Sequence, residues 1–237
     1  MRTRRTGTTP GTAEARFRGY DVMSQAESWD ETTTPVILRR LARHGAPRFF
    51  SADEEPAARA LLDHLLAQND EPKVPVFEMV DARLADGQPD GYHYDDLPRD
   101  PATWRWSLQA LDAAARERAG VRFSELDPDG QRDLIEDVRI CDGRWQGLPA
   151  GHLFGVWMRY ACSSFYSHPW AWNEIGFGGP AYPRGYKHLA LDGREPWEVQ
   201  EVDAHDPIPW ADRAEDAKKR HADGLSSRRP APDEEPA

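Results

Sequence analysis

Histidine is the side chain that most often serves as a metal ligand or as a general base near neutral pH, and this chain contains eight of them. No two lie four positions apart, the spacing that brings two imidazoles to one face of a helix for zinc. An HExxH segment and a two-histidine, one-carboxylate spacing are also missing. We therefore expect no catalytic residue and no metal ligand among the histidines, which are His44, His64, His93, His152, His168, His188, His205 and His221.

The sequence signatures of nucleotide and haem binding are absent as well. No GxGxxG segment follows a predicted strand, and Gly176, Gly178 and Gly179 lie in a proline-rich turn with no helix ready to receive a phosphate. Haem attachment would need CxxCH, which does not occur. A GxSxG segment is missing, and Ser163 and Ser164 read as small packing residues inside an apolar helix. The expectation is a chain that binds no cofactor itself.

The two cysteines, Cys141 and Cys162, are too few for a disulfide framework and do not match a zinc pattern. We expect buried thiols that behave as small apolar side chains. The alternative is a disulfide, within the chain or to a partner.

The elements that would position any site are helices. Apolar residues recur with helical spacing over residues 35–44, 51–68, 76–85, 101–118, 127–141 and 149–167. Ser51 and Glu54 form a capping-box pattern, and Asp127 followed by Pro128 is a typical helix start. Residues 149–167 are apolar around most of the helix, which predicts a central position. The fold class expected is mainly α, a small bundle of about five helices.

The chain divides into four segments by composition. We predict a flexible N-terminal tail over residues 1–35, a helical domain over 36–169, an irregular arm rich in aromatic residues and proline over 170–212, and a disordered tail over 213–237. The arm holds seven bulky aromatic residues without helical or strand periodicity: Trp170, Trp172, Phe177, Tyr182, Tyr186, Trp197 and Trp210.

Burial of these aromatic rings alone does not offset the conformational entropy lost when some forty residues without regular structure become ordered. The arm therefore either packs on the helices of its own chain with many further contacts, or becomes ordered on another chain. A third interpretation is a sugar or cofactor site. Tryptophan and tyrosine are the residues that most often anchor interfaces, and the prolines lower the entropy lost on docking.

The segment YSHPWAWNEIGFGGPAYPRGY, residues 166–186, resembles the signature of the gluconate 2-dehydrogenase subunit 3 family, and the similarity extends over residues 49–210. The resemblance implies the small subunit of a complex. Its large partner is a flavoprotein of the glucose–methanol–choline (GMC) oxidoreductase type, which carries FAD and oxidises a sugar or polyol. A multihaem cytochrome c often accepts the electrons, and the small subunit is thought to help the large one to fold, mature or be exported.

On this basis we predict a non-catalytic accessory subunit whose partner interface contains His168, Trp170, Trp172, Asn173, Glu174, Phe177, Tyr182 and Tyr186. The alternatives are a free-standing carbohydrate-binding protein, whose tryptophans stack on sugar rings, and a structural helical protein whose arm packs inward.

Composition excludes some partners and bears on location. A net charge of −11 without a basic stripe argues against nucleic acid, and no apolar run is long enough to span a bilayer. Arg4 and Arg5 suggest a twin-arginine signal, but the apolar stretch that must follow such a pair is missing. We therefore expect no signal peptide and a cytoplasmic location, with a periplasmic or membrane-associated complex as the alternative.

Overall fold

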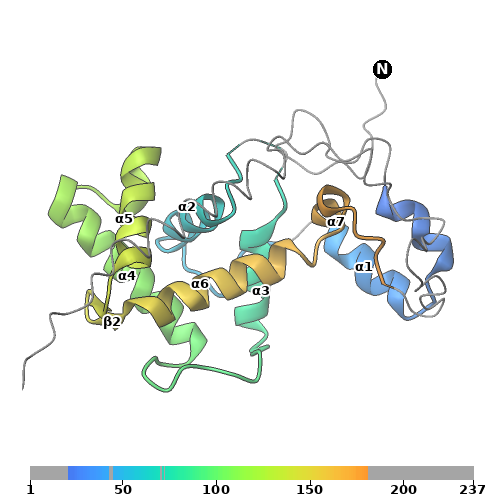
Figure 1. Ribbon diagram of the computed structural model, residues 1–237, viewed down its shortest axis with the longest axis horizontal. Coiled ribbons are helices and arrows are strands. Elements are labelled where there is room, and N and C mark those ends of the chain that lie inside the picture. The colour runs from blue at the N-terminus through green and yellow to red at the C-terminus, as the bar shows by residue number, and fades with distance from the viewer. Residues whose placement is uncertain (1–20, 43–44, 70, 72, 181–237) are drawn as a thin grey trace, which may run out of the picture.

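The computed structural model describes residues 21–42, 45–69, 71 and 73–180. Within this part of the chain there are seven α-helices, two short 3-10 helices and one two-stranded sheet, so the mainly α prediction is confirmed. The number of α-helices exceeds the five or so that were expected. Figure 1 shows two regions, a larger helical body that contains α2 to α6 and a smaller group at one end that contains α1 and α7.

The helices of the body follow the sequence signals closely. In chain order the elements of the described chain are η1 (Val22–Ser28), α1 (Thr33–Leu41), α2 (Glu55–Leu65), α3 (Val76–Ala85), α4 (Asp100–Ala119), η2 (Phe123–Glu125), α5 (Pro128–Ile140), β1 (Arg144–Trp145), β2 (Leu148–Pro149), α6 (Ala150–Phe165) and α7 (Pro169–Ile175).

The predicted helix starts are present in the structure. The hydroxyl of Ser51 accepts the backbone N–H of Glu54 at 3.3 Å, and the carboxylate of Glu54 accepts the backbone N–H of Ser51 at 2.9 Å. This reciprocal pair satisfies two donors that the first turn of α2 leaves without a partner. At the start of α5, the carboxylate of Asp127 accepts the backbone N–H of Gly130 at 2.7 Å, and Pro128 follows it as the first helical residue.

Helix α6 lies at the centre of the body, as its apolar circumference predicted. It packs against α2, α3, α4 and α5, and Leu153, Val156, Trp157 and Tyr160 are almost completely buried. The indole N–H of Trp157 donates to the hydroxyl of Ser107 on α4 at 3.0 Å, which satisfies a polar atom in the core. The body is therefore a conventional helical core built around α6.

Two buried carboxylates fix the connections between these helices. Asp81 on α3 accepts the backbone N–H groups of Arg48, Phe49 and Phe50 at 2.7, 2.9 and 2.9 Å. Asp112 on α4 accepts the backbone N–H of Phe123 at 3.0 Å. Charge-assisted bonds of this kind are stronger than neutral ones, so Asp81 holds the segment that precedes α2 and Asp112 holds the start of η2.

The short hairpin before α6 was not predicted. Arg144 pairs with Pro149 and Trp145 with Leu148 in an antiparallel register. The two residues between the strands, Gln146 and Gly147, both have positive φ angles (46° and 80°), as a tight hairpin turn requires. Only Gly147 is of a type that favours such a turn, and the strands have two residues each, too few to show alternation.

The smaller group, here called the small lobe, consists of η1, α1 and α7. Its core is a separate cluster of Val22, Trp29, Ile37 and Trp172. Two sequence predictions are wrong here. Residues 21–35 were predicted to be a flexible tail but contain η1 and the beginning of α1. Residues 170–175 were predicted to be irregular but are helical in α7.

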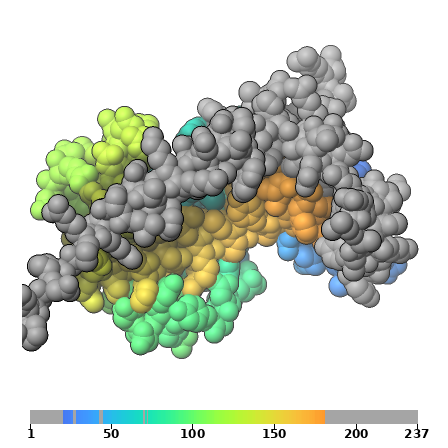
Figure 2. Space-filling model, in the orientation of Figure 1, coloured from blue at the N-terminus to red at the C-terminus, as the bar shows by residue number. Residues whose placement is uncertain are grey.

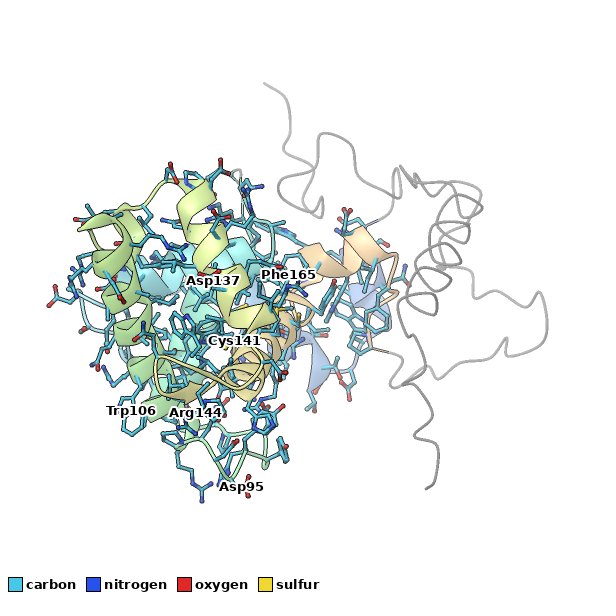
Figure 3. All side chains as sticks on the ribbon, turned by 60° about the vertical axis from the view of Figure 1, so that its left-hand side comes forward. Asp95, Trp106, Asp137, Cys141, Arg144 and Phe165 are labelled. Atoms are coloured by element: carbon cyan, nitrogen blue, oxygen red, sulfur yellow. The ribbon has the colours of Figure 1, made fainter. Side chains whose placement is uncertain are left out.

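Residues 1–20 of the predicted N-terminal tail, residues 181–212 of the predicted arm and the predicted C-terminal tail over 213–237 lie outside the described residues. Figure 3 places Phe165 at the end of α6 that faces α7, and Trp106 at the far edge of the body. The junction between body and small lobe is therefore the corner between α6 and α7.

Candidate partner-binding surface

The corner between α6 and α7 is formed by a proline that ends one helix and begins the next. Helix α6 ends at Phe165, and Pro169 is the first residue of α7. The ring nitrogen Nδ1 of His168 accepts the backbone N–H of Trp170 at 3.2 Å, so His168 caps the new helix. The residue before proline is pushed out of the helical region, whereas proline itself is well suited to the first helical position. His168 and Pro169 together therefore end one helix, begin the next and turn the chain between them.

The inner side of α7 is buried in the small lobe. Trp172 is 5% exposed and lies in the cluster with Val22, Trp29 and Ile37. Its indole N–H donates to the backbone carbonyl of Tyr166 at 2.6 Å, which ties the helix to the preceding turn. Trp172 thus serves as the core of the lobe.

Helix α7 is also bonded to the N-terminal part of the described chain. The side-chain oxygen of Asn173 accepts the backbone N–H of Val22 at 2.8 Å. A Cβ atom at Gly179 would lie 3.1 Å from side-chain atoms of both Trp29 and Val22, so the chain after α7 passes directly over this cluster. Sequence segments about 150 residues apart are therefore interlocked around α7.

Arg40, on α1, fixes the same corner from the other side. Its Nη1 donates to the backbone carbonyl of Ser167 at 2.8 Å, and its guanidinium carbon lies 5.7 Å from the centre of the Trp172 ring. Burial lowers the pKa of Arg40 because the charged form is partly removed from water. Arg40 remains charged at physiological pH, since arginine begins from a very high value.

Three exposed apolar residues lie on the corner or directly after it. Tyr166 is 50% exposed, Ile175 is 47% exposed and Phe177 is 39% exposed. In Figure 2 the atoms of α7 lie next to those of α1 at one end of the molecule. Exposed apolar side chains held on a fixed turn and a short helix are typical of a protein-binding surface.

The structure separates the predicted interface residues into three groups. His168, Trp172 and Asn173 are buried, so they shape the corner from inside. Trp170 and Glu174 are half-buried, with Trp170 packed against the body, and Phe177 is exposed. Tyr182 and Tyr186 lie outside the described residues. Their role in binding a partner stays a prediction.

Sequence reasoning missed Arg40, Tyr166 and Ile175. Arg40 lies in the helix predicted over residues 35–44, but nothing in the sequence indicated that this helix packs on α7. Tyr166 and Ile175 belong to the motif over residues 166–186, but they were not among the predicted interface residues, and their exposure became visible only in the structure.

The cysteines are not bridged. Cys141 follows α5 and Cys162 lies on α6, and both are free thiols with partial burial. Burial raises the pKa of the Cys162 thiol, which keeps it protonated and poorly reactive at neutral pH. The structure shows no bridge between these two residues, and their role as small apolar side chains stays a prediction.

A second polar cluster holds the loop between α3 and α4 against α6. The carboxylate of Asp100 accepts the phenol O–H of Tyr160 and an N–H of Arg159, both at 2.8 Å. Arg159 also pairs with Asp90 at 2.8 Å, and Asp90 pairs in turn with Arg83. Burial, followed by the bond to Asp100, raises the pKa of Tyr160 well above its usual range. The cluster is internally paired, and we interpret it as a structural network.

Several histidines make contacts that the sequence could not specify. The Nε2 of His64 lies 2.8 Å from the side-chain oxygen of Gln131. His152 pairs with Asp96 at 2.7 Å, and its ring is stacked on Tyr94 with 4.0 Å between the centroids. In the part of the chain that the structure describes, no three metal-ligating side chains are grouped to hold an ion. No helix among the described residues is long and apolar enough to cross a bilayer.

Comparison with known families decides the class of the protein. Residues 52–179 match the family described as gluconate 2-dehydrogenase subunit 3, and this range is more than half of the chain. The chain belongs to this family. The match runs from the residue after Ser51 to Gly179, so the gluconate 2-dehydrogenase subunit 3 region includes α2 to α7 but not η1 or α1. No individual curated protein and no solved structure matched the chain.

Proposed function

We propose that this chain is an accessory subunit of a dehydrogenase complex, in which it binds and stabilises a catalytic flavoprotein of the GMC type. In this proposal the large subunit carries FAD and oxidises a sugar or polyol, and a cytochrome c accepts the electrons. Membership of the gluconate 2-dehydrogenase subunit 3 family supports a role within such a complex. The chain itself is proposed to hold no cofactor and to supply no catalytic group.

One observation carries the proposal, namely the fixed corner that presents an apolar surface. Tyr166, Ile175 and Phe177 are exposed, while the turn and α7 beside them are held by the hydrogen bonds of Trp172 and Asn173. A surface that is ordered before binding loses little conformational entropy on association. An aromatic and aliphatic patch of this kind is suited to fill a pocket on a partner protein.

The geometry favours docking over direct sugar binding. Stacking on a sugar ring needs an open aromatic face, and Trp172 is 5% exposed within the small-lobe core. Trp170 is half-buried against the body. The first two tryptophans of the motif therefore serve packing, which supports an interaction with protein.

The location of the complex remains a prediction. The sequence led us to expect the cytoplasm, and a periplasmic or membrane-associated complex is the alternative. Fractionation of cells that produce the tagged chain, with the flavin absorbance followed in each fraction, distinguishes the two.

Co-expression with the adjacent FAD-dependent subunit tests the proposal. We expect the tagged chain to co-purify stoichiometrically with a larger, yellow flavoprotein. Ile175→Glu should weaken the complex by about tenfold or more, because it places a charge in an apolar contact. Ile140→Glu is the matched control, since Ile140 is a 62% exposed isoleucine on α5, at the other end of the molecule.

Two results would contradict the proposal. One is recovery of the wild-type chain as a separate monomer beside a soluble, flavin-loaded large subunit. The other is an equal loss of binding for Ile175→Glu and Ile140→Glu, which would remove α7 as the docking surface.

A further inference from the structure

A cleft of about 350 Å³ lies beside the corner, between the small lobe and the body. Its walls come from the end of α1 and the segment after it, from the segment that leads into α3, and from the beginning of α7. The polar and aromatic side chains that line it are Arg40, Lys73, Glu78, His168 and Trp170. The remaining lining is apolar or backbone, from Leu41, Ala42, Gly45 and Pro75.

Two of the three charged side chains in this cleft already have partners outside it. Lys73 pairs with Asp63 at 2.6 Å, and Glu78 pairs with Arg59 at 2.8 Å. Arg40 differs, because no carboxylate in the part of the chain that the structure describes forms an ion pair with it. Its polar contact is the Ser167 carbonyl, and its other contact is the Trp172 ring.

A guanidinium group has five N–H donors arranged to match a carboxylate with two parallel bonds. One donor of Arg40 is used by Ser167, so others remain for a ligand. The hydrogen bond to Ser167 and the contact with Trp172 restrict the side chain, which reduces the entropy lost when a ligand binds. A partly buried cation without a counter-ion is energetically unfavourable, and an incoming carboxylate would remove that penalty.

We propose that this cleft receives the carboxylate of an aspartate or glutamate side chain of the dehydrogenase subunit, bound by Arg40 and covered by Trp170. The inference rests on the proposed function, because it names the chemistry that the partner brings to the same corner. Trp170 lines the cleft and belongs to α7, as does the exposed Ile175. A partner that docks on α7 at Ile175 therefore lies on the same short helix as Trp170, which lines the cleft.

Because the chain carries a net negative charge, Arg40 should help to determine which partner surface binds beside the cleft. At a net charge of −11, the chain as a whole repels acidic surfaces, so an acidic side chain is accepted only where a local cation compensates for it. Arg40 would thereby determine the position in which the partner docks.

The test compares two adjacent arginines in the complex of this chain with its flavoprotein subunit. Arg39 is exposed on the same helix and does not line the cleft, so Arg39→Gln is the control for Arg40→Gln. We expect Arg40→Gln to raise the Kd at least about tenfold, and Arg39→Gln to change it less than about twofold. The dependence of Kd on salt should be shallower for Arg40→Gln than for wild type, because one charge pair is absent.

Arg40→Lys and a thermal melt of each variant separate binding from folding. Lysine keeps the charge without the planar fork, so Arg40→Lys should bind between wild type and Arg40→Gln and keep the wild-type salt dependence. If Arg40→Gln melts far below wild type, the Kd of Arg40→Lys decides, because the inference requires Arg40→Lys to bind more weakly than wild type while it melts at the wild-type temperature.

Three results would overturn the inference. One is a complex that forms normally with Arg40→Gln, with the salt dependence unchanged, which leaves the proposed function intact. Another is failure of the wild-type chain to form the complex, which removes both proposals. The third is tight, Arg40-dependent binding of sodium acetate to the isolated chain without any effect of Arg40→Gln on the complex, which would make the cleft a site for free carboxylic acids.

Discussion

The side-chain oxygen of Asn173 accepts the backbone N–H of Val22 at 2.8 Å, although the two residues are 151 positions apart. This bond is buried, and it joins the first described element of the chain to the last. It belongs to the small lobe, where Trp172, the residue before Asn173, packs in one cluster with Val22, Trp29 and Ile37. The corner that we propose as the docking surface therefore depends on the N-terminal segment that packs behind it.

Loss of this bond should loosen the small lobe and leave the body intact. Asn173→Ala leaves the buried N–H of Val22 without an acceptor, which costs about 1–3 kcal/mol. Hydrogen exchange should show faster exchange of the Val22 amide and unchanged protection in α6. Asn69→Ala is the control, because Asn69 is exposed. Equal protection of Val22 in wild type and Asn173→Ala would show that the bond does not hold the lobe.

Gly179→Ala should also destabilise the small lobe. Gly179 has a φ angle of +77°, and an added Cβ would lie 3.1 Å from atoms of both Trp29 and Val22. We expect a loss of about 1–2 kcal/mol, seen as an increased rate of proteolysis or exchange in the lobe. Gly151→Ala on α6 has open space for a Cβ and should be neutral or slightly stabilising. A Gly179→Ala variant as stable as Gly151→Ala would contradict the packing described here.

The carboxylate of Asp81 should contribute strongly to the stability of the body. An asparagine amide offers only one acceptor oxygen and no charge, so Asp81→Asn cannot hold three backbone N–H groups as the carboxylate does. Urea denaturation should show a loss of about 2–4 kcal/mol in the free energy of unfolding. Asp95→Asn changes the same group on the exposed loop marked in Figure 3 and should have little effect. Similar midpoints for the two variants would show that the Asp81 bonds do not stabilise the loop.

Tyr160 should make stability decrease at alkaline pH. Its raised pKa means that the folded protein holds the phenol proton more tightly than the unfolded chain, in which tyrosine ionises near about pH 10. The resulting stabilisation is complete below that pH and is lost as pH rises toward the folded pKa, by about 1.4 kcal/mol per pH unit.

Tyr160→Phe removes this titration. The variant should be about 1–2 kcal/mol less stable at neutral pH, because Asp100 loses a donor, and its stability should decline less steeply above about pH 10. Urea denaturation at neutral and alkaline pH measures both effects. Tyr166→Phe, at a 50% exposed position, should reproduce the wild-type pH profile. If the free energy of unfolding falls equally with pH in wild type and in Tyr160→Phe, the alkaline decrease does not come from Tyr160.

The helices of the body were predictable because their signals are local. The capping box at Ser51 and the Asp127–Pro128 start depend on residues within one turn, and α3 begins at Val76 and ends at Ala85 as the apolar spacing indicated. The central position of α6 followed from apolar residues around its circumference. These features need no information about distant parts of the chain.

The small lobe could not be predicted in the same way. Helix α7 has only seven residues, which is too short for its apolar and polar residues to show a helical spacing in the sequence. The helix predicted over residues 149–167 stops two residues before Pro169, and no second helix was expected to begin at this proline. Val22 and Trp29 are buried by residues near position 172, and no local pattern reports a contact across such a distance. For the same reason, the sequence could not distinguish buried His168 and Asn173 from exposed residues of the motif.

The topology of the small lobe also sets an order of events during synthesis. The helices of the body, α2 to α6, have all been made once Phe165 has left the ribosome, whereas Trp29 and Ile37 gain their cover only after Trp172 has been made. Contacts of such long sequence separation form late, because the intervening chain must first be ordered. While the body is being translated, residues 22–37 therefore lack their packing partner, and among the described elements the docking corner forms after the helices of the body.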